Sequence, residues 1–314
     1  MTDDQEAVEL IAGAKSAIAF TGAGISVESG IPHFRGEGGL WTRFDPYRVA
    51  HIDTLRKDPR EYWSYSLNYR RSGAEPNPAH FALSELQRQG RLGPIITQNT
   101  DGLHQKAGSR DVIELHGSSA GVVCLDCAAT FPRERIDAIN RTQCPPPCPS
   151  CQGSHLKPTV VLFGEPLPAE ALSRAQSAAR EADLVLVIGS SLQVYPAAGI
   201  PRLALANGAS LCIINAEPTR LDPEATVRGP RQGRRSAAPG RGPATGRQPA
   251  SLTGKVWPQF GQTIRVWLAG ALKSASQLGQ AYSRCGFSKR ARSSAIAPAT
   301  SPRSTAGLPH SVQR

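Results

Sequence analysis

Long apolar runs are missing from this sequence. None of its 314 residues lies in a stretch of about eighteen consecutive apolar residues, which is the length that a helix needs to cross a lipid bilayer. The chain begins MTDDQEAVEL, an acidic stretch without the basic and then apolar order of a secretory signal peptide. We therefore expect a cytoplasmic protein with no membrane partner.

Cysteine is scarce as well. Seven cysteines in a chain of this length are too few for a disulfide-rich secreted scaffold. Five of the seven lie between residues 124 and 151. Such crowding favours a bound metal over disulfide bridges.

Acidic residues are absent from the last part of the chain. Residues 228–314 carry fifteen Lys and Arg side chains and no Asp or Glu, whereas residues 1–227 carry 21 basic and 25 acidic side chains. The formal net charge of +11 therefore belongs to the tail alone. The composition predicts a globular domain over residues 1–227 and a basic, disordered tail, rich in Gly, Pro, Ser and Arg, over 228–314.

Short apolar runs alternate with stretches of helical pattern along the globular part. We predict a helix at the N-terminus, helices over 78–89 and 169–181, and buried parallel strands over 16–20, 94–97, 112–115, 159–163, 184–188 and 211–214. This alternation predicts an α/β fold, a Rossmann-like doubly wound parallel sheet. A Cys- and Pro-rich segment interrupts the alternation and predicts a small inserted module of about residues 121–156.

Two C-x-x-C pairs lie inside this module. Cys124 and Cys127 are followed, after twenty residues, by Cys148 and Cys151, a spacing at the edge of the range for zinc ribbons. Four thiolates leave no open position for water, so we expect one structural zinc ion. Cys144 is an alternative ligand, but three prolines separate it from Cys148, and the shorter spacing is favoured.

Three of the predicted strands end in residues typical of cofactor binding. These are, in chain order, Gly22, Ala23 and Gly24; Gly189, Ser190 and Ser191; and Asn215, Ala216 and Glu217. Glycines let backbone N–H groups approach a pyrophosphate, and the Glu217 carboxylate could hold ribose hydroxyls. Because doubly wound sheets bind ligands at the carboxyl ends of their strands, the three segments predict a dinucleotide site.

Two further strands end in polar residues. Gln98, Asn99 and Asp101 follow one of them, and His116 follows the next, directly before a glycine. A single histidine is more often structural. A histidine at a strand end is nevertheless placed to act as a general base near neutral pH.

The motifs follow one another in the order found in sirtuins. They are GAGISVESGIPHFRG, TQNTDGLHQKAG, ELHG, the paired C-x-x-C, FGE, GSSLQVYPA and INAEPT. Over roughly residues 1–227 the sequence closely resembles the sirtuin family, of bacterial type, with an atypical C-terminal tail. The resemblance implies an NAD-dependent protein-lysine deacetylase or deacylase that transfers the acyl group to ADP-ribose and releases nicotinamide. NAD would be its co-substrate and acyl-lysine proteins or peptides its partners, and we expect a monomer.

The resemblance also implies roles for single residues. His116 would deprotonate a ribose hydroxyl, with Asn99 and Asp101 as the other catalytic residues. The NAD site would comprise Gly22, Ala23, Gly24, Phe34, Arg35, Gln98, Asn99, Asp101, Gly189, Ser190, Ser191, Asn215, Ala216 and Glu217, with Phe34 and Arg35 on a mobile loop. The peptide would add as a strand to Val161, Phe163 and Gly164.

One departure from related sequences concerns acyl specificity. Members that remove succinyl and malonyl groups carry a Tyr-x-x-Arg pair, and here Leu67 stands at the tyrosine position if Arg70 is the arginine. A succinyl carboxylate would then lack a cation in the acyl-lysine tunnel that the resemblance implies, so we expect acetyl-lysine to be preferred.

Two other functions remain open on the sequence alone. A zinc ribbon beside a basic tail is also a design of nucleic-acid-binding proteins, although this leaves the cofactor-type strand ends unexplained, and nucleic acid is not an expected partner. A mono-ADP-ribosyltransferase of the same fold is the nearer alternative.

The tail has two interpretations. Residues 231–239 can be encoded by CGG CAA GGC CGG CGA AGT GCT GCC CCG, and reading from the second base gives Gly-Lys-Ala-Gly-Glu-Val-Leu-Pro, a string that resembles the sirtuin segment at this point. We therefore interpret the chain after about Val227 as translated out of the family's reading frame. The alternative is a native basic tail.

Overall fold

The structure, a computed structural model, describes residues 3–36, 38–69 and 73–229. The basic tail and Arg70 thus lie outside the described residues, apart from the tail's first two positions. The α-helices are α1 Asp3–Gly13, α2 Pro46–Val49, α3 Ile52–Lys57, α4 Pro59–Tyr69, α5 Pro78–Arg88, α6 Leu103–Lys106, α7 Arg133–Thr142, α8 Ala169–Glu181 and α9 Gly199–Ala206. The strands are β1 Ala17–Thr21, β2 Ile95–Thr97, β3 Val112–Glu114, β4 Gly117–Cys124, β5 Thr130–Pro132, β6 Leu156–Val160, β7 Leu184–Ile188, β8 Ser210–Ile214 and β9 Val227–Arg228. Short 3-10 helices cover Ala23–Ser29, Leu40–Thr42 and Asp222–Glu224.

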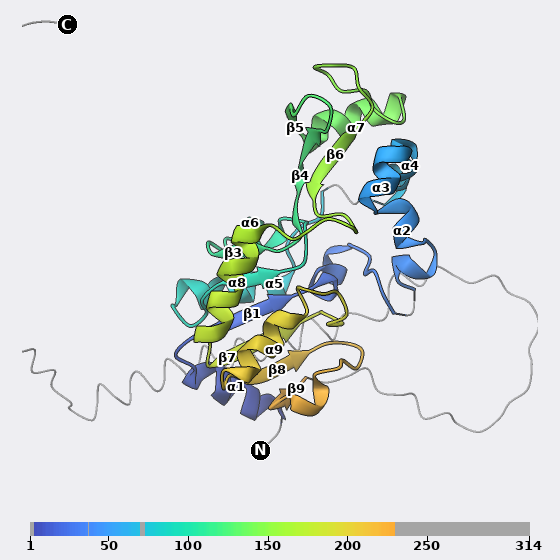
Figure 1. Ribbon diagram of the computed structural model, residues 1–314. Coiled ribbons are helices and arrows are strands. Elements are labelled where there is room, and N and C mark those ends of the chain that lie inside the picture. The colour runs from blue at the N-terminus through green and yellow to red at the C-terminus, as the bar shows by residue number, and fades with distance from the viewer. Residues whose placement is uncertain (1–2, 37, 70–72, 230–314) are drawn as a thin grey trace, which may run out of the picture. The chain divides into compact units, whose positions relative to one another are not determined.

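The larger sheet has the strand order of a dinucleotide-binding fold. Its order is β3-β2-β1-β7-β8-β9, and every neighbouring pair is parallel (Figure 1). Counted within this sheet alone, the order is 3-2-1-4-5-6, which reverses direction between β1 and β7. The predicted doubly wound parallel sheet is confirmed, and ligands of such sheets bind where the order reverses.

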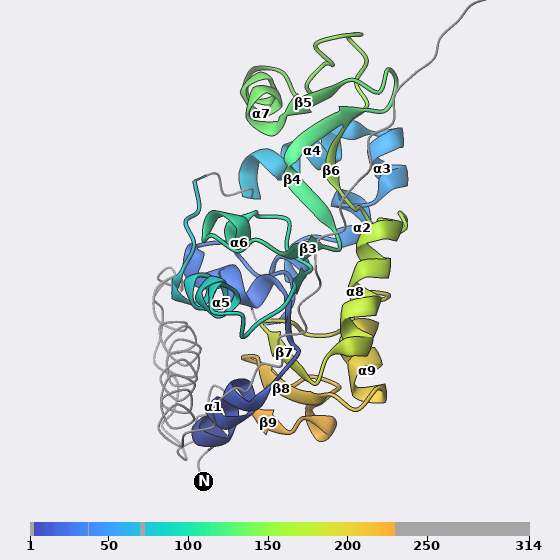
Figure 2. The same ribbon diagram turned by 90° about the vertical axis from the view of Figure 1, so that its left-hand side faces the viewer.

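Helices cover both faces of this sheet, and alternation along the strands explains why. In β1, Ala17 and Ala19 pack with α1 and α5, whereas Ile18 and Phe20 pack with α8 and α9. Residues of β7 divide in the same way between the two cores. Figure 2 shows α1 and α5 on one side of the sheet and α8 and α9 on the other. A strand buried on both faces reads as a continuous apolar run, which is why β7 was predictable from sequence.

The second sheet belongs to the cysteine-rich module. Its order is β5-β4-β6, and both pairings are antiparallel. The prediction of a buried parallel strand over residues 159–163 is therefore wrong, because the chain here forms β6, which ends at Val160 and pairs antiparallel with β4. An apolar run signals a strand but does not say which partner the strand will meet.

The module shares its core with helix α4, which comes much earlier in the chain. Trp63 of α4 is fully buried among Val122, Phe131, Ile136 and Leu156 of the module, and its ring N–H donates to the Leu156 carbonyl at 3.0 Å. Both views place α3 and α4 beside the module (Figures 1 and 2).

None of the described helices is long and apolar enough to span a membrane.

Candidate functional site

The glycine loop after β1 packs against the loop after β7, at the point where the strand order reverses. The Gly22 N–H donates to the Ile188 carbonyl at 3.0 Å, and the Gly24 N–H donates to the Gly189 carbonyl at 2.8 Å. A Cβ on Gly24 would lie 2.6 Å from the Gly189 Cα, and Gly189 itself has a φ of +64°, which favours glycine. These glycines are required because two backbones meet, and the N–H groups of Gly22 and Gly24 are used inside the chain.

Gln98 links this meeting point to His116. Its side-chain amide donates to the Ser190 Oγ at 2.7 Å, and its backbone carbonyl lies 2.9 Å from His116 Nδ1. A carbonyl can only accept, so Nδ1 carries the proton and Nε2 is left with its lone pair. No hydrogen bond between His116 Nε2 and another described residue is present.

The environment of His116 favours its neutral form. Burial lowers the pKa of His116 below its usual value, and the hydrogen bond to the Gln98 carbonyl opposes that shift in part. Neutral imidazole with a free Nε2 can accept a proton near pH 7. The hydrogen bond and the lowered pKa are compatible with the general-base role predicted for His116.

Asn99 and Asp101 meet on a serine that sequence reasoning did not single out. Ser26 Oγ donates to Asp101 Oδ2 at 2.7 Å and accepts from the Asn99 side-chain amide at 3.1 Å. The same amide donates to the Gly22 carbonyl at 3.1 Å, and the Asp101 Oδ1 accepts from the Leu103 N–H at 2.9 Å. Because these bonds tie the two polar side chains to the glycine loop, its 3-10 helix and the start of α6, the side chains are held before any ligand binds.

Two buried histidines lie beneath this network, and their role was not predicted either. His80 and His104 are 0% and 1% exposed, with ring centroids 4.9 Å apart. Burial lowers the pKa of His80 to about 4, against an opposing effect of the Asp101 carboxylate. Burial, and then the neighbouring His80, lower the pKa of His104 to about 3. Both rings are neutral at physiological pH.

His104 supports the strand ends through two threonines. Its Nε2 lies 2.9 Å from Thr21 Oγ1, which lies 2.8 Å from Thr97 Oγ1. Thr97 Oγ1 also accepts the Asn99 N–H at 3.0 Å. A buried histidine and a serine inside a Gly-Ile-Ser turn are ordinary in sequence, so only their proximity reveals the network.

The third strand end meets the loop that carries Phe34 and Arg35. The Asn215 amide donates to the Glu217 carbonyl at 2.8 Å, and the Glu217 carboxylate lies directly against Gly36, at the position that a Cβ would take. Ala216, between Asn215 and Glu217 in the sequence, is half-buried. Phe34 is 40% exposed and stacks on Trp41 with ring centroids 5.0 Å apart. The Arg35 loop is thus adjacent to the Glu217 carboxylate, which the sequence suggested could hold ribose hydroxyls.

The remaining residues predicted for the NAD site lie on the loops after β1 and β7, which meet where the strand order reverses. Ala23 begins the 3-10 helix after Gly22, and Ser191 follows Ser190 as a half-buried residue.

The predicted peptide-binding residues follow β6. The Val161 N–H donates to the His116 carbonyl at 2.8 Å. The Phe163 N–H and carbonyl are bonded to Ala50 and Ile52 at 2.9 and 3.0 Å. Among the described residues, no hydrogen bond uses the Val161 carbonyl or the Gly164 N–H. Strand addition by a peptide would therefore fall to Val161 and Gly164, while Phe163 contributes its ring.

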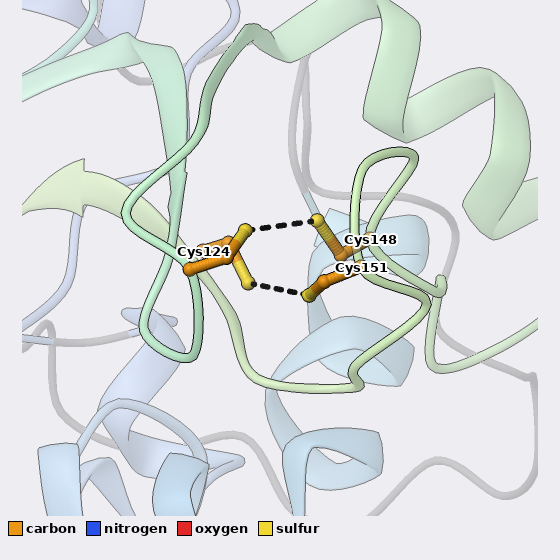
Figure 3. A group of neighbouring side chains, drawn as sticks. Cys124, Cys148 and Cys151 are labelled. Carbon is orange, nitrogen blue, oxygen red and sulfur yellow. Dashed lines mark hydrogen bonds between the residues drawn. The ribbon is translucent and has the colours of Figure 1, made fainter.

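The four cysteines of the two C-x-x-C pairs converge. Their sulfur atoms all lie within 4.8 Å of one another, with Cys124 to Cys151 at 3.7 Å and Cys127 to Cys148 at 3.8 Å. Tetrahedral zinc with bonds of about 2.3 Å to sulfur requires sulfur atoms about 3.8 Å apart. Figure 3 shows the labelled Cys148 and Cys151 facing Cys124 across the space between the two C-x-x-C loops. The arrangement fits one structural zinc ion.

The alternative ligand, Cys144, lies outside this cluster. Its Sγ is 3.4 Å from Ser64 Oγ on α4, so the preference for the shorter spacing agrees with the structure. Burial opposes ionisation of the Cys148 thiol, but hydrogen bonds from the N–H groups of Cys151 and Ser150, together with those of the Cys124 and Cys151 thiols, lower the pKa of Cys148 to about 7. Backbone donors aimed at a sulfur favour the thiolate that zinc requires.

Comparison with known proteins agrees with this architecture. The sequence model of the Sir2 family matches residues 22–196. An NAD-dependent protein deacylase 2 of Archaeoglobus fulgidus is 50% identical over 221 residues, which cover 70% of this chain and 87% of that protein. An NAD-dependent protein deacetylase of Caldivirga maquilingensis is 47% identical over 226 residues, or 71% of this chain and 86% of that protein.

Solved structures give the same result. A structure solved to explain the mechanism and regulation of Sir2 enzymes matches with a TM-score of 0.74 and 40% identity. The match covers 87% of this chain and 98% of that chain. A Sir2 enzyme bound to a myristoylated histone peptide has a TM-score of 0.69 and 36% identity, covering 88% of this chain and 98% of that chain. The parallel sheet, the cysteine cluster and these similarities together show that the chain belongs to the Sir2 family.

Proposed function

We propose that this chain is an NAD-dependent protein-lysine deacylase, which transfers an acyl group from lysine to ADP-ribose and releases nicotinamide. The observation that carries the proposal is the placement of His116, whose Nδ1 bonds to the Gln98 carbonyl while the Gln98 side chain bonds to Ser190. A base whose Nε2 has no hydrogen-bond partner among the described residues is thereby joined to the loop after β7, which packs against the glycine loop. The names of the similar enzymes support the same reading.

The chain's own residues fit an NAD molecule at this place. Since the N–H groups of Gly22 and Gly24 are bonded to Ile188 and Gly189, we assign the phosphate contact of this loop to Ala23 at the start of the 3-10 helix. Asn99 and Asp101, fixed by Ser26, would line the nicotinamide and ribose side. Ser190, Ser191, Asn215 and Glu217 would bind the adenosine half, and Phe34 and Arg35 would close over it.

The reaction needs an electrophile and a base. NAD, when bound, would supply an electrophilic ribose carbon for the acyl oxygen, with nicotinamide as the leaving group. His116 Nε2 would accept a proton from a ribose hydroxyl, which a neutral and partly buried imidazole can do at pH 7. Val161 and Gly164 hold the peptide main chain, and the Phe163 ring lies along the acyl-lysine.

The module and the surroundings complete the proposal. The four cysteines hold zinc for structure alone, because a site with four cysteine ligands leaves no open position for catalysis. We propose that the catalytic domain ends near Val227, that the enzyme acts as a monomer in the cytoplasm, and that the chain after Val227 is not part of the catalytic unit.

One assay tests the function. Full-length protein loaded with zinc is incubated with NAD labelled in the adenosine moiety and an acetyl-lysine peptide, and nicotinamide and labelled products are measured. The proposal requires peptide-dependent nicotinamide release and label in acyl-ADP-ribose. Label transferred to protein would instead indicate a mono-ADP-ribosyltransferase. No nicotinamide release, with retention of the protein on DNA or RNA, would favour the zinc-ribbon alternative.

A further inference from the structure

Lys157 is a buried cation that none of the steps above uses. It lies in β6, directly after Leu156 of the module core, and only 10% of its side chain is exposed. Lysine is almost never buried to this degree unless its ammonium is paired. Its Nζ lies 3.0 Å from Oε2 of Glu165, whose side chain is 24% exposed.

The ammonium uses all its donors within one short segment. Besides Glu165, Nζ donates to the carbonyls of Pro158 at 3.1 Å and Val160 at 2.8 Å. An ammonium has three N–H donors, so these contacts satisfy it. The Glu165 Oε2 also accepts the Leu162 N–H at 2.8 Å, and the Leu162 carbonyl accepts the Glu165 N–H at 3.1 Å.

These contacts fold residues 158–165 around the Lys157 ammonium. The folded segment contains Val161, Phe163 and Gly164, the residues assigned above to the peptide. Beyond its pairing with β4, the segment's backbone is bonded to the His116, Ala50 and Ile52 backbone. Losing the ammonium would therefore release the segment on one side and leave it tethered on the other.

We propose that Lys157 and Glu165 form a positioning pair that holds this segment in the shape required for the main chain of an acyl-lysine peptide. The pair touches neither the peptide nor NAD in this scheme, and it acts through the backbone of residues 160–164. It determines how well an extended peptide binds, and it leaves NAD binding unchanged. The proposal rests on the proposed deacylase function.

The test compares wild type with K157M, E165Q and the double variant K157M/E165Q. K157M should raise the peptide KM by about tenfold, because small displacements of a positioning backbone have large kinetic effects. The NAD KM should change by less than about twofold, since no contact of the pair reaches the NAD-site residues. The double variant leaves no uncompensated buried charge, so it stays folded and should show the same peptide KM increase.

A second measurement separates positioning from loss of stability. A long acetyl-lysine peptide offers a main chain to residues 160–164, whereas a blocked single acetyl-lysine offers almost none. The kcat/KM for the long peptide divided by the kcat/KM for the single acetyl-lysine should fall in K157M and in the double variant. It should fall less in E165Q, because glutamine can still accept the Leu162 N–H.

R133M serves as the matched control. Arg133 forms another buried ion pair in the module, to Asp137 at 2.7 Å, with side-chain exposures of 1% and 16%. Its other side-chain contacts are to Tyr62, Trp63 and Ser66 of α4, outside residues 158–165. Its removal should lower stability without changing the substrate ratio.

Each outcome decides something. Equal changes in the peptide and NAD KM values, no change in either, or the same substrate ratio in R133M and K157M would overturn the positioning pair while the deacylase function stands. Absence of peptide-dependent nicotinamide release in wild type would instead overturn the proposed function itself.

Discussion

The buried pair His80 and His104 should make the fold sensitive to mild acid. Both side chains are excluded from solvent, and burial lowers their pKa values to about 4 and about 3 in the folded protein. In the unfolded chain a histidine has a pKa of about 6.5. Below pH 6.5 the unfolded state therefore binds protons that the folded state does not, and the free energy of unfolding falls as pH falls.

The size of the effect follows from these values. Between pH 7.5 and pH 5.0, each histidine removes about 2 kcal/mol from the free energy of unfolding, because the unfolded form alone is protonated over this window. The pair together removes about 4 kcal/mol, a large share of the roughly 5–15 kcal/mol that stabilises a typical domain. The loss ends as pH falls through the folded pKa values of about 4 for His80 and about 3 for His104.

The variant H104Q isolates one of the two groups. A glutamine amide can still hydrogen-bond to Thr21 Oγ1, as His104 Nε2 does, but it does not titrate. Urea unfolding of wild type and H104Q at pH 7.5 and pH 5.0, with the same zinc concentration throughout, gives four free energies. The loss between the two pH values should be about 2 kcal/mol smaller in H104Q. An equal loss in the two proteins would refute the assignment of His104 as a buried neutral group.

Further predictions concern catalysis, metal, substrate and the gene. His116→Ala should lower turnover by about a hundredfold or more while NAD binding and folding are retained, and steady-state kinetics with a thermal melt check this. Serine at each cluster cysteine should abolish zinc binding and destabilise the protein, since structural zinc contributes roughly 10 kcal/mol or more, whereas Cys144→Ser should keep its zinc in native mass spectrometry. An acetyl peptide should have a higher kcat/KM than a succinyl peptide of the same sequence, and the reverse order would point to Arg70 or Arg71. Sequencing the coding DNA around codon 231 should show codons compatible with the shifted frame, and incompatible synonymous codons would end that interpretation.

Local signals in the sequence predicted the parts of the fold that depend on local physics. The segment 169–181 has the composition of a helix and is α8 with the same bounds. The apolar run 184–188 is β7, again with the same bounds. Helix α5 begins at a proline after Asn77, whose side chain caps it. Periodicity and capping act within a few residues of one another, so one sequence is enough to read them.

The zinc cluster was predictable for a related reason. Two C-x-x-C pairs can converge on one ion, and the chemistry of the ligand is written in the residue type. What the spacing did not contain was the packing of the module on Trp63, because nothing local in α4 indicates a partner some sixty residues or more further along the chain.

Which segments of the chain contact one another was decided by tertiary structure alone. Residues 159–163 have the pattern of a strand in the parallel sheet, yet β6 pairs with β4. The two C-x-x-C loops, which converge, bring β4 and β6 together. Gly22 and Gly24 read as a phosphate loop, and the structure shows that their small size serves the contact with Gly189. The sequence by itself determined several helices and strands, among them α5, α8 and β7, and the four cysteines of the metal cluster. The network of Ser26, His80 and His104 exists only once distant segments pack, because hydrogen bonds depend on distance in space and leave no period in the sequence. The Lys157–Glu165 pair lies within one short segment, but it depends on the fold of residues 158–165, which no period in the sequence indicates.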